Sequence, residues 1–205
     1  MDIFCLTETW HDANSACIGR LRTGGFNVVD RPRPRVRDDL STNHGGVAVV
    51  TSDCVSMSPV AMTSASTFEH VVVCGQFNCI VVALYRPGSS TVQQRFFEEL
   101  ATLVEQVATY QVPVYIAGDF NIRLDRSDDA HAAQLRQLVD CYGLLLHDSV
   151  ATHQLGDTLD AITCDDVSRP HLVTVADVAL SDHHLLQLSV PRRPSRSFKL
   201  DRDGS

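Results

Sequence analysis

The spacing of hydrophobic and polar residues predicts a chain in which buried strands alternate with amphipathic helices. Apolar runs rich in β-branched residues, several of them alternating, are typical of strands in a half-buried or buried sheet. We expect strands at residues 2–7, 26–29, 44–50, 68–77, 79–85, 112–117, 172–180 and 185–190, with weaker candidates at 55–61, 144–147 and from about 158. This pattern indicates an α/β or α+β domain.

Three segments have the period of a helix. A short helix is expected after Asn14 or Ser15 and through Leu21, and a longer one follows Ser90 and Gln93, which form a potential capping box. The third follows a cluster of capping residues at 127–129 and is predicted to end at Gly143. The second and third helices each present apolar residues on one face, so we expect both to cover a sheet.

The segment 112–124, VPVYIAGDFNIRL, combines a buried strand with a polar turn. Gly118 ends the strand and leaves Asp119 and Asn121 together at its tip, where ligand sites of α/β sheets are found. A carboxylate and an amide on rigid backbone suit a divalent cation or an attacking water. Gly, Asp and Asn are also ordinary turn residues, so this segment alone leaves both readings open.

Other expected strand ends carry residues with the same chemical potential. Taken singly, each has a structural explanation, as a turn, a helix entry or a core aromatic. Their common placement at strand ends favours a shared site, whose candidate residues are Glu8, Tyr85, Asp119, Asn121, Asp160, Asp182 and His183. Asp160 stands inside an otherwise apolar strand, where a carboxylate needs a partner.

Composition limits the class of protein without naming its partner. The 205 residues suffice for one domain, expected over 1–190, and 44% of them are hydrophobic. A net charge of −8 argues weakly against a broad nucleic-acid-binding face, although acidic residues at a metal site contribute to that count. Seven cysteines without a Cys-x-x-Cys motif, and no leader or long apolar span, lead us to expect an intracellular protein with reduced thiols and no membrane contact.

Two segments are basic. Four arginines between Arg31 and Arg37 alternate with prolines or valine and predict an exposed loop, either a solvated linker or a contact for phosphate. Residues 191–205 contain further arginines and prolines and are expected to form a basic linker or disordered tail.

Six short motifs occur in order along nearly the whole chain. Together they resemble the endonuclease/exonuclease/phosphatase superfamily, and most closely the apurinic-type endonuclease domain of non-LTR (LINE-like) retrotransposons. The motifs are CLTETW (5–10), GGVAVV (45–50), YRPG (85–88), GDFNI (118–122), THQLGDTLDAI (152–162) and SDHHLL (181–186). One of them alone would be a weak signal, whereas six in register are a strong one.

The resemblance implies a four-layer α/β sandwich of two packed mixed sheets flanked by helices, with the site at one edge. It also implies that Glu8 binds Mg²⁺, with Mn²⁺ as an alternative, and that Asp182 completes the metal set. Asp119 would orient or deprotonate the attacking water, and Asn121 would donate to a phosphate oxygen.

For the remaining site residues, the resemblance implies that His183 stabilises the pentavalent phosphorus centre while Asp160 fixes its imidazole ring. Tyr85 would donate a hydrogen bond to the phosphate. His184 follows His183, but neighbours in a strand face opposite sides, and the family pattern favours His183. The other histidines, including His153, are interpreted as structural or surface residues.

The function implied is a Mg²⁺-dependent phosphodiesterase that nicks target DNA, in the nucleus, for the reverse transcriptase of a parent polypeptide. Alternatives are a phosphomonoesterase or phospholipid phosphodiesterase of the same superfamily, and an inactive remnant. The family begins with a further strand that carries an Asn near the metal, and this sequence lacks it before Glu8. We therefore expect a truncated domain that is weak or inactive alone and active when it is extended upstream.

Overall fold

A computed structural model describes residues 2–33, 45–76, 78–148, 150–165, 172–179 and 181–190. Its central element is a six-stranded mixed sheet in the order β4-β5-β6-β7-β9-β8. The strands are β4 (Met57–Pro59), β5 (Glu69–Gly75), β6 (Ile80–Tyr85), β7 (Val114–Asp119), β8 (Leu145–His147) and β9 (Asp160–Cys164). Only β6 and β7 pair in parallel, so helix α2 (Gln94–Ala108) forms the crossover between them.

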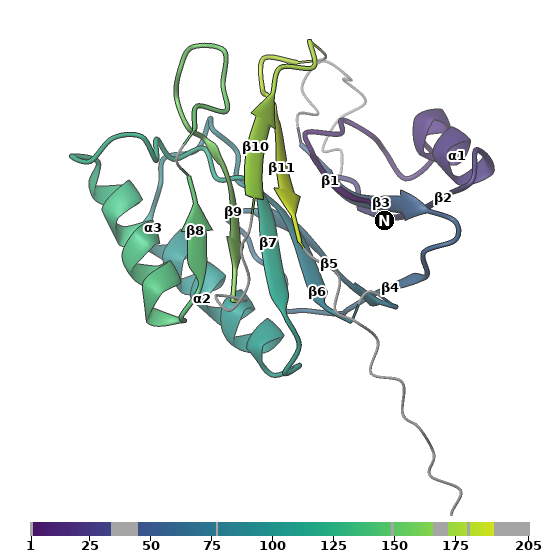
Figure 1. Ribbon diagram of the computed structural model, residues 1–205, viewed down its shortest axis with the longest axis horizontal. Helices are drawn as coiled ribbons and strands as arrows, with labels where there is room; N and C mark the ends of the chain where they lie inside the picture. The colour runs from purple at the N-terminus through teal and green to yellow at the C-terminus, as the bar shows by residue number, and fades with distance from the viewer. Residues whose placement is uncertain are drawn as a thin grey trace, which may run out of the picture.

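Two smaller antiparallel sheets form a second layer on one face of this sheet (Figure 1). One has the order β1-β3-β2, and the other pairs β10 with β11. Their strands are β1 (Ile3–Thr7), β2 (Phe26–Arg31), β3 (Val47–Ser52), β10 (Leu172–Ala176) and β11 (Leu185–Ser189). In the part of the chain that the structure describes, no ladder of hydrogen bonds joins β1 to β11.

Helices complete four layers. Helix α2 and helix α3 (Ala130–Cys141) cover the other face of the six-stranded sheet, and α1 (Ala16–Thr23) lies against β2. The largest core cluster fills the space between the sheet and the two long helices, with Phe96, Leu100 and Leu135 fully buried. A second cluster, which includes Val47, Val73 and Val81, lies between the two sheet layers.

The predicted architecture is therefore confirmed, with a refinement in the second layer, which is antiparallel and divided into two sheets. The third helix is capped as predicted, since the Asp129 carboxylate accepts from the backbone N–H groups of His131 and Ala132. The capping box expected at Ser90 is wrong: Gln93 is the N-cap residue of α2 and makes no side-chain capping bond. Helix α2 is positioned instead by its buried face, which packs in the main core cluster through residues such as Phe96 and Leu100.

The expected tail, residues 191–205, and most of the predicted basic loop, residues 34–43, lie outside the described residues. The structure contains all seven cysteines as free thiols, and three of them, Cys17, Cys54 and Cys141, are exposed. Among the described helices, none has the length and apolar character needed to cross a membrane.

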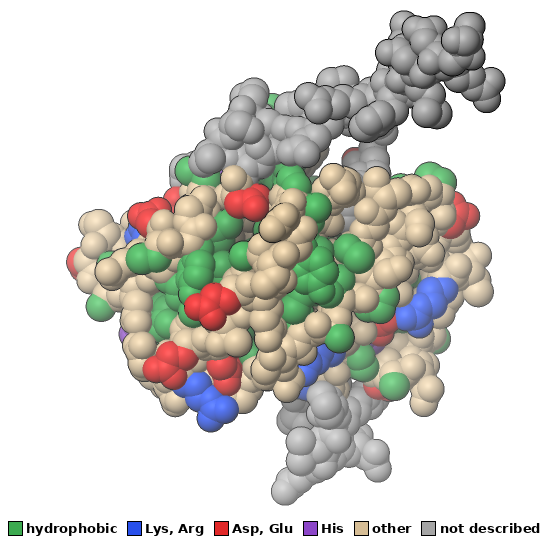
Figure 2. Space-filling model, turned by 90° about the horizontal axis from the view of Figure 1, so that it is seen from below, with side chains coloured by type: hydrophobic (Ala, Val, Ile, Leu, Met, Phe, Trp, Pro, Cys, Tyr) green, Lys and Arg blue, Asp and Glu red, His purple; other side chains and the backbone are tan. Residues whose placement is uncertain are grey.

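Some apolar surface stays exposed on the second layer. On β1, Phe4 is 46% exposed and Leu6 is 37% exposed, and Leu172 at the start of β10 is 64% exposed. Figure 2 shows the end of the molecule that lies lowest in Figure 1, and hydrophobic side chains gather in the middle of that face. A divided sheet has more strand edges than a continuous one, and these edges carry unpaired backbone groups.

The backbones of β6 and β7 approach closely at Gly118. A Cβ atom built on Gly118 would lie 1.8 Å from the carbonyl oxygen of Leu84, and the φ angle there is +155°. Only glycine fits this position without displacing backbone. The close approach brings the end of β7, and Asp119 with it, against the end of β6.

We predict that Gly118→Ala lowers the free energy of unfolding by at least about 3 kcal/mol, because backbone must move to relieve the contact. Gly143→Ala is the matched control, since Gly143 also has a positive φ of +68° but has no atom within 4 Å of a built Cβ. Its cost should be only about 1 kcal/mol. Urea denaturation of the three proteins measures the difference, and equal losses in the two variants would contradict this interpretation.

Candidate active site

The site forms where the end of β7 lies beside the start of β9. The antiparallel register pairs Asp119 directly with Asp160, so two carboxylates lie side by side at one edge of the sheet. His183, which enters from the loop before β11, places its Nδ1 atom 2.8 Å from Oδ2 of Asp160. Ligand atoms of Asp119, Asp160 and His183 all lie within 4.8 Å of one another. The predicted residues of three separate motifs are thus brought together.

Asp119 is buried, with 2% of its surface exposed. Its Oδ1 accepts from the backbone N–H of Asn121 at 2.8 Å, and its Oδ2 accepts from the Asn121 side chain at 2.6 Å. Burial and the neighbouring charge of Asp160 raise the pKa of Asp119 to about 7, although the Asn121 N–H and His183 oppose the rise. A carboxyl group with this pKa can accept a proton near neutral pH.

Asn121 has a φ angle of 49°, in the left-handed region that asparagine tolerates better than most residues. Its side-chain amide also donates to the Arg86 carbonyl oxygen at 2.8 Å. Asn121 therefore links the tip of β7 to the loop after β6.

His183 is held by a charged hydrogen bond. This bond to Asp160, helped by the charges of Asp160, Asp119 and Asp182, raises the pKa of His183 to about 9 against the effect of burial. Asp160 is fixed in turn, because the hydroxyl oxygen of buried Thr152 accepts from the backbone N–H groups of Leu159 and Asp160, both at 3.0 Å. His183 is therefore mainly an imidazolium at neutral pH.

Glu8 and Tyr85 form the opposite rim of the site. The Tyr85 hydroxyl donates to Oε1 of Glu8, and Trp10 donates to its Oε2 at 3.4 Å. Burial and the hydrogen bond to Glu8 raise the pKa of the Tyr85 hydroxyl, which stays protonated. Glu8 is exposed and has a φ of 49°, and its charge contributes to the raised pKa of Asp119.

His153 is a neighbour of the site that the sequence analysis treated as structural. Its Nε2 lies 3.4 Å from Oδ2 of Asp182, and its ring meets the His183 ring edge-on with centres 5.0 Å apart. The backbone N–H of Leu155 donates to its Nδ1 at 3.2 Å, so the neutral ring carries its proton on Nε2 and donates it to Asp182. The sequence signal that could have found His153 was its place in the motif THQLGDTLDAI (152–162), which also contains Asp160.

Arg86 is the second residue that sequence reasoning missed. It is only 3% exposed, and its guanidinium group donates to four backbone carbonyl oxygens. Two belong to the turn after β7, at Phe120 (2.6 Å) and Asn121, and two to the loop after β6, at Pro87 (3.0 Å) and Ser90 (2.8 Å). Arg86 therefore fixes the GDFN turn rather than presenting its charge to a ligand.

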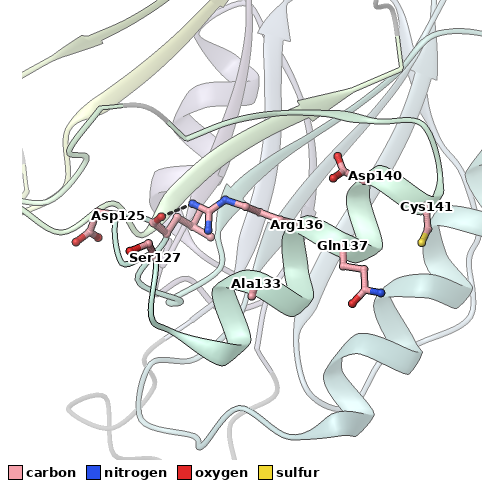
Figure 3. Close-up of a pocket in the computed structure, with 8 residues that line it drawn as sticks. Asp125, Ser127, Ala133, Arg136, Gln137, Asp140 and Cys141 are labelled. Carbon is pink, nitrogen blue, oxygen red and sulfur yellow. Dashed lines mark hydrogen bonds between the residues drawn. The ribbon is translucent and has the colours of Figure 1, made fainter.

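A separate pocket lies along α3 and contains none of the predicted site residues (Figure 3). Its Arg136 side chain points toward the carbonyl oxygen of Leu124, to which it donates, and also pairs with Asp148 at 2.7 Å. Those bonds give the arginine a structural role in joining α3 to the loop after β7.

The donor set of the site fits a divalent cation. Carboxylate oxygens are the ligands that Mg²⁺ and Mn²⁺ prefer, and Glu8, Asp119, Asp160 and Asp182 supply them around one edge. Glu8 lies outside the two compact groups of ligand atoms, which are Asp119, Asp160 and His183, and His153, Asp182 and His183.

The four-layer sandwich thus carries an acidic, histidine-containing group of side chains at one edge. The sequence model of the Endonuclease/Exonuclease/phosphatase family matches residues 1–186, and the chain belongs to that family. Comparison with curated protein sequences finds no match.

Solved structures with the same fold share little sequence with this chain. A 3′ phosphatase, NExo, from Neisseria bound to a product DNA hairpin aligns with a TM-score of 0.67 and 19% identity, over 93% of this chain and 89% of its own. An AP endonuclease from Archaeoglobus fulgidus aligns with a TM-score of 0.63 and 14% identity, covering 92% and 88%. The endonuclease domain of TRAS1, a telomere-specific non-LTR retrotransposon, gives 0.60 and 16%, covering 82% and 79%.

We predict that Arg86→Met destabilises the protein by about 3 to 5 kcal/mol, because buried carbonyl groups lose their donors. Arg86→Lys should recover less than half of this loss, since an ammonium group cannot reach both loops in the forked geometry of a guanidinium. Arg20→Met, on the exposed surface of α1, is the control and should change stability by less than about 0.5 kcal/mol. Full recovery by lysine would refute a bridging role.

The raised pKa of His183 also predicts a pH dependence of stability. Because the pKa is higher in the folded protein than the ordinary value of 6.5, this stabilisation is complete below 6.5 and is lost as pH rises through about 9. The difference in Tm between the wild type and His183→Gln should therefore shrink between pH 6 and pH 10. A difference that stays constant over this range would show that His183 is not held as an imidazolium.

Proposed function

We propose that this protein is a metal-dependent phosphodiesterase that acts as a DNA endonuclease and nicks target DNA for a non-LTR retrotransposon. The observation that carries the proposal is the contact group of Asp119, Asp160 and His183, a proton acceptor facing a charged imidazolium. Hydrolysis at phosphorus needs both, because the nucleophile loses a proton while negative charge develops on the phosphate oxygens.

Asp119 orients a water molecule and takes its proton as the oxygen attacks phosphorus. The Asn121 amide donates to Oδ2 of Asp119 at 2.6 Å and to the carbonyl oxygen of Arg86 at 2.8 Å, and so fixes the carboxylate that handles the water. His183 uses Nδ1 for Asp160, so its Nε2–H is the donor for the substrate. Its positive charge offsets the charge of the transition state.

Glu8 and Asp182 are proposed to hold Mg²⁺, which Mn²⁺ can replace. The bound ion would supply Lewis-acid stabilisation of the phosphate and leaving oxygens. Tyr85 orients Glu8 through its hydroxyl, and His153 orients Asp182 in the same way on the other side. Both carboxylates thus have a neighbour that limits their rotation.

DNA is proposed as the substrate because structural relatives act on it by name, one of them bound to a DNA hairpin and another an AP endonuclease. The similarity to the TRAS1 endonuclease domain supports the retrotransposon assignment. On this proposal the domain works in the nucleus beside a reverse-transcriptase domain of the same parent polypeptide.

A phosphomonoesterase is the second candidate. The NExo structure is that of a 3′ phosphatase with the same fold, so the fold accommodates removal of a terminal phosphate as well as cleavage within a strand.

We expect the protein to nick supercoiled plasmid at a low rate in the presence of Mg²⁺, and chelation of the metal to stop the reaction. Asp119→Ala and His183→Ala should each lower kcat by about 10² to 10⁴, the usual contribution of a proton-transfer or charge-stabilising group. Asp128→Ala, an exposed carboxylate just before α3, is the matched control and should retain full activity.

Release of phosphate from a 3′-phosphorylated oligonucleotide without nicking would favour the second candidate. If the wild type and both site variants are equally inactive on every substrate while all three are folded, the chain is a remnant and the proposal fails.

A further inference from the structure

A basic groove lies next to the site and is not used by the proposed chemistry. It has a volume of about 530 Å³ and runs between the end of β2, the segment before β5 and the loop that leads into α2. Among the described residues, one glutamate, Glu69, and four arginines line it; the arginines are Arg31, Arg33, Arg86 and Arg95.

This groove stands out against the charge of the whole protein. The chain has a net charge of −8, so its average surface repels a polyanion, whereas three arginines other than the buried Arg86 line this groove, two of them in ion pairs. The charge of Arg31 also affects His70. Burial is the main cause that lowers the pKa of His70 to about 4, and the positive charge of Arg31 lowers it further. A polyanionic ligand would be directed to this groove.

The arginines that face the groove are held in place but remain accessible. Arg95 uses its Nε to bind Glu99 at 2.9 Å, one helical turn away, while 65% of its side chain is exposed. Arg33 uses its Nε to bind Glu69, with 26% of its side chain exposed. In both residues the ion pair involves the inner nitrogen of the guanidinium group.

The wall of the groove is rigid. The Glu99 carboxylate accepts from the backbone and hydroxyl groups of both Ser66 and Thr67, at 2.7 to 2.9 Å, and so ties α2 to the segment before β5. Although burial opposes it, these bonds lower the pKa of Glu99 to about 2. On the opposite side, Arg86 holds the loop from Pro87 to Ser90. A wall held in this way needs little reorganisation to bind a ligand.

One contact links the groove to the rim of the site. The Arg33 guanidinium lies over the Tyr85 ring, 5.7 Å from its centre, and the Tyr85 hydroxyl binds Glu8. A nucleic-acid strand carries one phosphate for about every 3.4 Å of helix axis, so a strand whose reacting phosphate meets Asp119 has further phosphates within reach of the groove. A single small phosphate ester would fill the site and leave the groove unused.

We propose that this groove binds the sugar–phosphate backbone of the strand that is cleaved, on one side of the reacting phosphate. Arg31, Arg33 and Arg95 contact its phosphates, and Arg86 maintains the loop between groove and site. The inference rests on the proposed function, because it supplies the substrate contacts that an endonuclease needs and a phosphomonoesterase does not.

The test measures DNA affinity separately from cleavage. Fluorescence anisotropy with a labelled 20-base-pair duplex, in Ca²⁺ in place of Mg²⁺, compares the full-length wild type with Arg31→Gln, Arg95→Gln and the double variant. Each single substitution should raise Kd about 3- to 10-fold and lower the slope of log Kd against log salt by about 1, as expected for loss of one phosphate contact. Arg20→Gln removes the same charge from the exposed surface of α1 and should change neither quantity.

Two activities separate failure of the groove from failure of the proposed function. The groove variants should lose more kcat/KM on plasmid nicking than on hydrolysis of bis(p-nitrophenyl) phosphate, which is too small to reach the groove. If plasmid is nicked but Arg31→Gln and Arg95→Gln bind DNA like the Arg20→Gln control, the groove assignment is overturned and the proposed function stands. If neither substrate is hydrolysed, yet DNA binding weakens only in the groove variants, the proposed function fails and the groove assignment is supported.

Discussion

The candidate site depends on the contact between the Asp119 and Asp160 carboxylates. Two carboxylates lie opposite each other at the end of β7 and the start of β9. One of them is almost fully buried, and such a pair is unfavourable unless positive charge is close by. His183 supplies that charge through its bond to Asp160. The remaining features follow from the need to hold this group together: the Thr152 hydroxyl fixes Asp160, and the Asn121 amide fixes Asp119.

The site is assembled from both layers of the sandwich. Asp119, Asp160 and Tyr85 belong to the six-stranded sheet, whereas Glu8 follows β1 and His183 precedes β11, in two sheets of the second layer. Since no ladder joins β1 to β11 in the described chain, each half of the second layer is positioned by packing on the central sheet. Side-chain bonds across the layers, from Tyr85 to Glu8 and from Asp160 to His183, therefore carry the alignment of the site.

Positive charge is used in two ways near the site. Arg86 is buried, and its donors are all directed at backbone carbonyl groups, so its role is to bind two loops together. Arg31 and Arg95 line a groove open to solvent and can attract a ligand. Burial and bonding partners thus separate the role of Arg86 from that of Arg31 and Arg95, although all three are arginines.

The sequence by itself predicted most of the strands and helices and named the residues of the candidate site. Period-2 and period-3.6 patterns report which face of a segment is buried, and chemistry at strand ends reports where Glu8, Asp119 and His183 emerge. Only the tertiary structure decided that Asp119 faces Asp160, that His153 approaches Asp182, and that distant arginines share one groove. These contacts depend on strand register and on packing between segments far apart in the chain, and no local pattern of residues encodes either.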